Sequence, residues 1–173
     1  ISEFPKATEY LEKYRGQLEA RSYLMKAGRK WYEYWVPQNP FLWDMPKVVF
    51  PDISVKPRFC YDESGAIVNG NCYWICSQTE EERKLLLLIE GVANSEVMMR
   101  YHDLCFNNKL YSGRRRYLTQ YIEQYPMPNP QSEYAQDIVR LVENINSEEN
   151  PIVRDRIAQK INDRVKQAFA IKD

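Results

Sequence analysis

Apolar side chains recur at helical spacing near the start of the chain. Pro5 suits the first position of a helix, where its missing amide hydrogen leaves no bond unmade. Apolar residues then follow three or four positions apart, at Ala7, Tyr10, Leu11, Tyr14 and Leu18. We therefore predict a helix from Pro5 to about Lys26 that ends before Gly28.

Two more apolar stripes of this kind lie near the end of the chain. Their members are Ala135, Ile138, Val139, Val142 and Ile145 in the first, and Ile157, Ile161, Val165 and Phe169 in the second. Between them, Asn150 followed by Pro151 is typical of a helix start, with Asn as the N-cap and Pro at the first helical position. The stripes predict a helical hairpin over residues 131–173.

Short apolar stretches separated by turn residues predict strands in the middle of the chain. We expect strands at Val48–Phe50, Arg58–Tyr61 and Cys72–Ser77. The glycine-containing segment 62–71 predicts that the last two pair as a hairpin. The aromatic, proline-containing segment 29–43 predicts a further strand that leads into a loop.

Two central helices are indicated after these strands. Thr79 and Glu82 form a capping box, which opens a helix through Leu85–Ile89 that is apolar on nearly every side and should be buried against the sheet. A second helix restarts at Ser95. The predicted fold is therefore α/β, more narrowly α+β, with a small mixed or antiparallel sheet, packed helices and a C-terminal helical hairpin.

Composition excludes several classes of protein. The 24 basic and 24 acidic side chains give no net charge, so any anion-binding site must be a local cluster. Four cysteines and one histidine fit free, buried thiols in a reducing cytoplasm better than a disulfide scaffold or a metal site. The longest apolar run, Leu85–Ile89, is too short to span a bilayer. We expect a cytoplasmic location, no membrane partner and no metal.

The sequence offers no set of catalytic residues. Its six glycines are isolated, so no glycine-rich turn can hold a nucleotide-like cofactor. The Asn-Pro pairs at Asn39 and Asn129 lack the second proline of the Asn-Pro-Pro-aromatic motif of amino-group methyltransferases and indicate loops. His102 and Cys105 lie one helical turn apart, but nothing else marks an activated nucleophile, and we expect a histidine on a helix surface.

One local run is strongly basic. Residues 107–117 contain Lys109, Arg114, Arg115 and Arg116, and no acid lies between Asp103 and Glu123. An ordinary solvated loop would explain this run. The alternative is contact with the phosphates or bases of a nucleic acid, which the planar donors of arginine suit and to which Tyr111 could contribute.

A second segment, Pro51–Pro57, places two rigid prolines around short polar stretches. Pro57 lies between Lys56 and Arg58, and it could present both cations with little conformational entropy left to lose. The structural alternative is that Asp52 or Ser54 caps local backbone while Arg58 pairs with an acid inside the fold. The sequence leaves both interpretations open.

These segments together carry a family resemblance. "KVVFPDISVKPRFCYD" followed by "GAIVNGNCYWI" resembles the signature of the TaqI-like C-terminal specificity domain of adenine-specific DNA methyltransferases and combined restriction–modification enzymes. "LLLLIEGVANSEVMMRYHDL" and "GRRRYLTQYIEQYPMPNP" follow in the family's order, and "GRKWYEYWVPQNP" is similar to its aromatic segment. Gln38 and Asn39 depart from the family by being neutral where a basic residue is expected. The resemblance covers residues 5–130.

The resemblance implies a DNA target-recognition domain over residues 5–130 and a spacer or docking hairpin over residues 131–173. Residues 1–4, "ISEF", begin without a methionine, and we expect them to be a cloning remnant on an excised fragment. The implied partners are double-stranded DNA and the N-terminal methyltransferase domain of a parent chain, which would bind S-adenosylmethionine; no cofactor is expected in this fragment. Weak pairing with a second copy through the C-terminal helices and a nuclease in the parent remain open. The expected DNA-binding residues are Lys30, Trp31, Lys56, Arg58, Lys109, Tyr111, Arg114, Arg115 and Arg116. The competing hypothesis is a protein-interaction module that works through its C-terminal helices.

Overall fold

The computed structural model describes residues 3–34, 39–68, 70–106 and 109–171. The chain divides into two compact units, Ile1–Pro40 and Phe41–Asp173, which we call the N-terminal unit and the main unit. Each unit is described by itself below. The division lies inside the predicted recognition domain, whose outer boundaries stay a prediction.

The N-terminal unit contains three short helices, so the prediction of one long helix is wrong. They are α1 (Pro5–Glu12), α2 (Arg15–Glu19) and α3 (Ser22–Lys26). The backbone leaves the helical conformation at Tyr14 and at Arg21. Tyr10 and Tyr14 are exposed, so the apolar stripe has little core to hold a continuous helix straight, and only Leu24 is buried among the residues of these helices.

The segment after these helices also differs from expectation. No strand forms in the described parts of residues 29–43, namely 29–34 and 39–43, and Pro40–Leu42 form the short 3-10 helix η1 instead. The backbone of Trp31 accepts a hydrogen bond from the Arg21 side chain, which fixes a turn where a strand was predicted. Residues 35–38 lie outside the described residues.

The main unit is built on a three-stranded antiparallel sheet with β1 (Lys47–Pro51) at its centre. β3 (Cys60–Asp62) and β4 (Cys72–Cys76) pair with its two edges, so the predicted hairpin between the last two strands is wrong. Val48 lies opposite Tyr61 on one side and Ile75 on the other. The most apolar strand, β1, lies at the centre, where both of its edges are paired and one face is buried. The turn residues between the strands do not determine this order.

A second, two-stranded antiparallel sheet joins distant parts of the main unit. It pairs β2 (Ile53–Ser54) with β5 (Arg115–Arg116). Pro51 ends β1, because a proline cannot continue the ladder with an amide hydrogen, and β2 begins two residues later. The backbone amide of Tyr117 donates to the backbone carbonyl oxygen of Asp52 at 2.7 Å and extends this pairing by one hydrogen bond.

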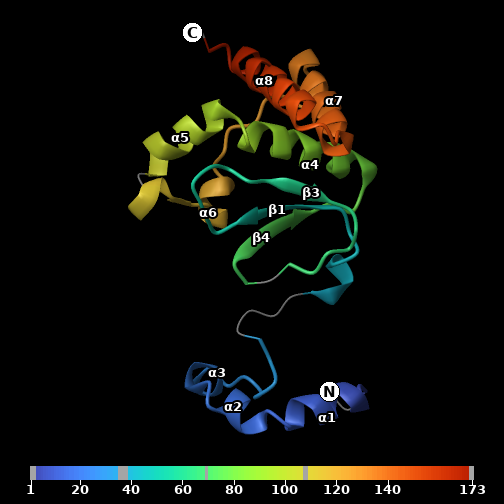
Figure 1. Cartoon of the computed structure of the whole chain (residues 1–173), viewed down its shortest axis with the longest axis vertical. Helices are drawn as coiled ribbons and strands as arrows, with labels where there is room; N and C mark the ends of the chain where they lie inside the picture. Colours follow the sequence, from blue (N-terminus) through green and yellow to red (C-terminus); the bar gives the residue numbers. More distant parts are fainter. Residues whose placement is uncertain (1–2, 35–38, 69, 107–108, 172–173) are drawn as a thin grey trace. The chain divides into compact units, whose positions relative to one another are not determined.

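Helix α4 (Glu80–Ala93) forms the middle layer of the main unit, between the sheet and the C-terminal helices (Figure 1). The predicted capping box is confirmed: the Glu82 amide donates to the Thr79 hydroxyl, and the Thr79 amide donates to the Glu82 carboxylate, both at 3.2 Å. Leu86, Leu87 and Leu88 are all buried because the helix is covered on both sides. Helix α5 (Glu96–Phe106) follows after Ser95.

The remaining helices close the main unit. They are the short 3-10 helix η2 (Tyr111–Gly113), α6 (Thr119–Ile122), α7 (Glu133–Ser147) and α8 (Pro151–Ala168). Helices α7 and α8 lie side by side, as predicted, and their buried residues Ile138, Val142, Ile161 and Val165 join one core with those of α4 and the sheet (Figure 1). The predicted fold class is confirmed. The prediction of buried thiols is wrong, since Cys60 and Cys105 are exposed and Cys72 and Cys76 are partly buried. Among the described residues, no helix has the length and apolar character of a membrane span.

Candidate nucleic-acid interface

The pairing of β2 with β5 brings the two basic segments together. Ile53 lies opposite Arg116, and Ser54 lies opposite Arg115. An isolated bridge between Lys109 and Arg115 adds the start of the basic run to the same structure. We call the surface formed by residues 53–58 and 109–116 the β2–β5 surface. Neither segment could be placed beside the other from the sequence.

Arg115 is the most completely bonded cation of this surface. Its Nε and one terminal nitrogen donate to the two Asp103 carboxylate oxygens at 2.6 and 2.8 Å. The other terminal nitrogen donates to the backbone oxygens of Val55 and Gly113. Only 13% of the side chain is exposed. The hydrogen bonds from Arg115 hold the pKa of Asp103 below its ordinary value, and Lys109 acts in the same direction, while partial burial opposes them.

Arg116 is also paired, but on the surface. Its guanidinium donates to the two Asp52 carboxylate oxygens at 3.3 and 2.9 Å, and 44% of its side chain is exposed. The hydrogen bond to Asp52 raises the pKa of Arg116 above its ordinary value. Asp52, which follows the first proline of the Pro51–Pro57 segment, therefore binds a residue of the basic run. Such exposed pairs contribute little to stability and can be exchanged for other partners.

Arg114 lies at the exposed end of the basic loop. Its guanidinium lies over the Tyr111 ring at 5.5 Å from the centroid, and Tyr111 is 75% exposed. The chain turns sharply here, since Ser112 and Gly113 both have left-handed backbone angles, with φ of 57° and 68°. The Leu110 amide donates to the Arg114 oxygen at 2.7 Å and closes the turn. No carboxylate pairs with Arg114 within the described ranges.

The remaining cations of the surface differ in their pairing. Lys109 is exposed, with its Nζ 3.3 Å from the Asp103 carboxylate. Lys56 and Arg58 are exposed, and in the part of the chain that the structure describes neither side chain makes an ion pair or hydrogen bond. The alternative prediction was that Arg58 pairs with an acid inside the fold. No such acid contacts Arg58 among these residues. The surface thus contains six cations, three of which pair with the carboxylates of Asp52 and Asp103, and its local charge is positive although the chain is neutral.

Two predicted binding residues, Lys30 and Trp31, belong to the N-terminal unit. There the Arg15 guanidinium lies 5.1 Å from the centre of the Trp31 ring, and the Lys30 ammonium lies 5.8 Å from the centre of the Tyr32 ring. These contacts leave Lys30 exposed and Trp31 partly buried. Their part in a common site with the β2–β5 surface stays a prediction.

An aromatic cluster that the sequence did not reveal lies next to β5. His102 is fully buried, so the prediction of a surface histidine is wrong. Its Nδ1 lies 2.8 Å from the Tyr125 hydroxyl, and its ring stacks on Tyr117 at 4.9 Å. Burial raises the pKa of Tyr117 to about 12, and its hydroxyl has no hydrogen-bond partner among the described residues. One signal was available: His102 lies four positions after the apolar Met98, on the same face of α5.

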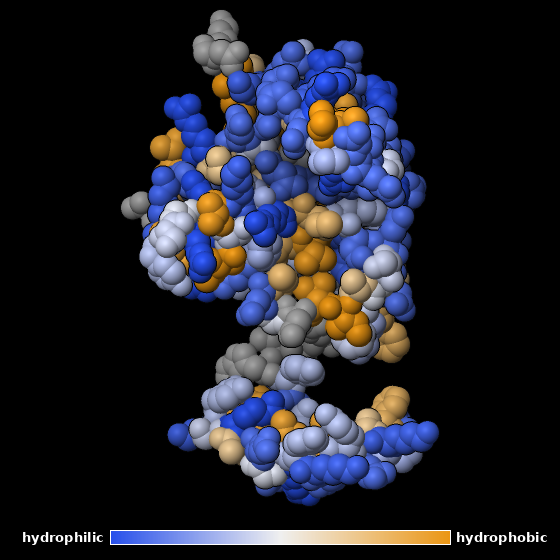
Figure 2. Space-filling model, in the orientation of Figure 1, coloured by the Kyte–Doolittle hydropathy of each residue, from blue (hydrophilic) through white to orange (hydrophobic). Residues whose placement is uncertain are grey.

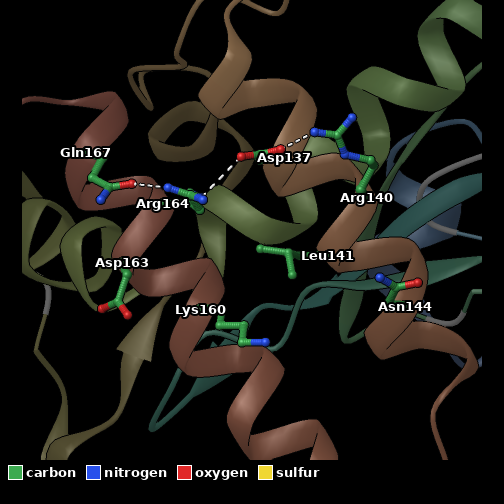
Figure 3. A pocket seen from close by; sticks show the side chains of 8 residues that line it. All are labelled: Asp137, Arg140, Leu141, Asn144, Lys160, Asp163, Arg164 and Gln167. Atoms are coloured by element: carbon green, nitrogen blue, oxygen red, sulfur yellow. Dashed lines mark hydrogen bonds and ion pairs between the residues drawn. The ribbon is translucent and has the colours of Figure 1, made fainter.

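A pocket lies on the C-terminal helices, between α7 and α8 (Figure 3). It has a volume of about 580 Å³, and three of its charged groups form a network: the Asp137 carboxylate binds Arg140 and Arg164, and Arg164 also donates to Gln167. Across the described ranges, no three His, Cys, Asp or Glu side chains gather as a metal site would require. The hollow therefore offers an ion-pair network that joins two helices rather than an arrangement for chemistry.

Comparisons with known proteins identify the family of the chain. The chain is 50% identical over 139 residues to the type II methyltransferase M.BanIII of Aneurinibacillus aneurinilyticus, which covers 80% of this chain and 24% of that protein. It is 25% identical over 130 residues to the type II methyltransferase M.XhoI of Xanthomonas vasicola, covering 75% and 23%, and 23% identical over 128 residues to M.PaeR7I of Pseudomonas aeruginosa, covering 74% and 21%. The chain thus spans about a quarter of the length of these relatives. Residues 5–127 match the TaqI-like C-terminal specificity domain, and the chain belongs to that family.

Proposed function

We propose that this chain is the double-stranded-DNA-binding target-recognition domain of an adenine N6 DNA methyltransferase or a combined restriction–modification enzyme. It positions the target for a separate N-terminal catalytic domain of its parent, where S-adenosylmethionine is bound, and it performs no catalysis itself. The observation that carries the proposal is the pairing of β2 with β5, because it gathers two basic segments into one surface in a chain without net charge.

The chemistry of the β2–β5 surface suits the DNA backbone and base edges. Lys56 and Arg58 flank the rigid Pro57, so less backbone freedom remains to be lost on binding than in a flexible loop. Arg114 offers a planar set of donors that matches two acceptors on a guanine edge, whereas Lys109 can act only as a point charge on phosphate. Lys30 and Trp31 are proposed as further contacts from the N-terminal unit.

The competing function, a protein-interaction module that uses the C-terminal helices, has less support. The apolar stripes of α7 and α8 are buried with α4, as the burial of Ile138 and Val142 indicates. Figure 2 shows that the visible outer surface over these helices is largely hydrophilic. Little apolar area therefore remains on that face for a stable partner, and pairing with a second copy would be weak.

The test is a salt titration of DNA binding. Short duplexes with a randomised centre are first selected for binding to the whole chain, and their affinity is then measured by fluorescence anisotropy at several salt concentrations. We expect affinity to fall steeply with salt because bound counterions are released from the DNA. A chain whose affinity does not depend on salt would contradict the proposal.

A pair of triple variants locates the surface. Replacing Lys56, Arg58 and Arg114 by alanine should reduce the salt slope by roughly one for each phosphate contact that is lost. The matched control replaces three exposed cations on α4 and α8, Lys84, Arg156 and Lys160, and should bind DNA as the wild type does. Equal affinities for the two triple variants would exclude the β2–β5 surface as the DNA-binding face.

A further inference from the structure

The three consecutive arginines of the β2–β5 surface have different partners, and this difference assigns them different roles. We propose that Asp103 and Arg115 form a clip that positions the loop of residues 109–114, so that Arg114 rather than Arg115 contacts DNA. The inference rests on the proposed DNA-binding function and assigns positions within it. Asp103 and Arg115 are then positioning residues, and neither touches the nucleic acid.

The donors of Arg115 are nearly all in use. A guanidinium has five N–H groups, and Arg115 directs two of them to the Asp103 carboxylate and two to the backbone oxygens of Val55 and Gly113. One donor remains, which cannot form the two parallel bonds that recognise a guanine. Contact with a base would require Arg115 to leave a bidentate, largely buried carboxylate.

The position of Asp103 supports the same assignment. It lies in the last turn of α5, where the helix dipole disfavours a negative charge. A carboxylate on a DNA-binding surface also repels phosphates. An acid placed against both of these effects must be held by its partners, and here those partners are Arg115 and, at 3.3 Å, Lys109.

The clip holds together three segments that are far apart in the sequence. Arg115 binds Asp103 at the end of α5, the backbone oxygen of Val55 in the Pro51–Pro57 segment, and the backbone oxygen of Gly113 in the turn of the basic loop. That turn contains Ser112 in a left-handed conformation, which costs a side-chain-bearing residue energy and persists only where its surroundings impose it. The Arg114 guanidinium, stacked on Tyr111, is thereby presented at the end of a fixed loop.

The Asp103→Asn variant tests the clip by the sign of its effect. If Asp103 were only a nearby negative charge, its neutralisation would tighten DNA binding. The clip predicts the opposite, a loss of affinity of roughly three- to thirtyfold, as is typical of coupled neighbouring residues. Glu123→Gln, which neutralises an exposed acid just after α6, is the charge-matched control and should bind no more weakly than the wild type.

Two arginine variants complete the experiment. Arg115→Lys keeps the charge but cannot form the fork, so it should lose affinity like Asp103→Asn, and the double variant should be no weaker than either single one. Arg114→Ala should keep the thermal midpoint of the wild type while lowering affinity for the selected duplexes by roughly five- to hundredfold and weakening the preference for them over unselected duplexes. All variants are compared in the whole chain on the selected duplexes, with circular dichroism to verify folding.

The outcomes separate the two proposals. Tighter binding by Asp103→Asn, full affinity in Arg115→Lys, or unchanged affinity in Arg114→Ala would each overturn the clip while leaving the DNA-binding function in place. Should Asp103→Asn fail to fold, the Arg115→Lys and Arg114→Ala results still decide, since both keep the Asp103 carboxylate. A wild-type chain without salt-dependent binding would refute the proposed function, and the inference with it.

Discussion

Gly91 of α4 and Ile138 of α7 are in such close contact that a Cβ atom at position 91 would lie 2.6 Å from the Ile138 Cγ2 atom. The same Cβ would lie 2.8 Å from a methyl group of Val142. Helix α7 can therefore approach α4 only where a side chain is missing. This contact attaches the C-terminal helices to the body of the main unit.

Gly91→Ala should therefore destabilise the main unit. Overpacking of this kind typically costs about 1–3 kcal/mol in the free energy of unfolding, which exceeds the gain that alanine brings to a helix. Urea unfolding followed by circular dichroism measures the effect. Gly16→Ala is the control, because nothing lies within 4 Å of that position; it should not destabilise the chain. Equal stabilities for the two variants would show that α7 shifts freely on α4.

Asn94→Ala should also destabilise the main unit, by removing a pair of long-range hydrogen bonds. The Asn94 side chain accepts from the Phe59 amide at 2.9 Å and donates to the Phe59 oxygen at 2.8 Å, so it acts as a strand partner just before β3. Its loss leaves two backbone groups without partners, at a cost of about 1–3 kcal/mol. Thermal unfolding measures this, with Asn144→Ala on the exposed face of α7 as control. A midpoint equal to that of the control would mean that water replaces the amide.

Glu90→Gln should stabilise the protein at neutral pH. Burial raises the pKa of Glu90 above its ordinary value of 4.5, although the hydrogen bond from Asn146 opposes the shift. A carboxyl group with a raised folded-state pKa favours the folded state while protonated, and this contribution is lost as the pH rises through that pKa. The gain of Glu90→Gln should therefore be largest at neutral pH and shrink as the pH falls towards 4.5. Thermal midpoints across this range check the sign, and a gain that grows towards acid pH would refute it.

The chain by itself should not bind S-adenosylmethionine. Its isolated glycines provide no turn for a nucleotide-like cofactor, and its Asn-Pro pairs lack the second proline of the amino-group methyltransferase motif. Isothermal titration calorimetry of the chain against the cofactor should give only heats of dilution. Saturable binding would place part of the cofactor site within this domain.

Local features of the fold could be predicted from the sequence, and long-range pairings could not. The capping box of Thr79 and Glu82 acts within one helical turn, so it marked the start of α4 correctly. The position of β1 between β3 and β4 depends on which edges meet in three dimensions, and the turn residues between β3 and β4 suggested a hairpin that does not form. The stripe of residues 7–18 indicated one helix because periodicity does not reveal whether a core is present to bury it.

The candidate site shows the same limit. The residue types of the basic run and of the Pro51–Pro57 segment were enough to mark each as a candidate. Their contact through Ser54 and Arg115 could not be predicted, because no sequence spacing determines it. Arg114, Arg115 and Arg116 are equivalent in sequence. The carboxylates that bind Arg115 and Arg116, those of Asp103 and Asp52, lie outside the run, so only the structure separates these two arginines from the exposed Arg114.

The pairing of β2 with β5 also determines at which stage of folding the basic surface can form. Ser54 leaves the ribosome long before Arg115, and the sheet of β1, β3 and β4 can form in the interval because all its strands precede α4. Closing the large loop between the two partners has an entropic cost that must be met by contacts made earlier, so the two-stranded sheet forms late in folding. The basic surface is therefore expected to become organised only after the sheet that contains β1 has formed.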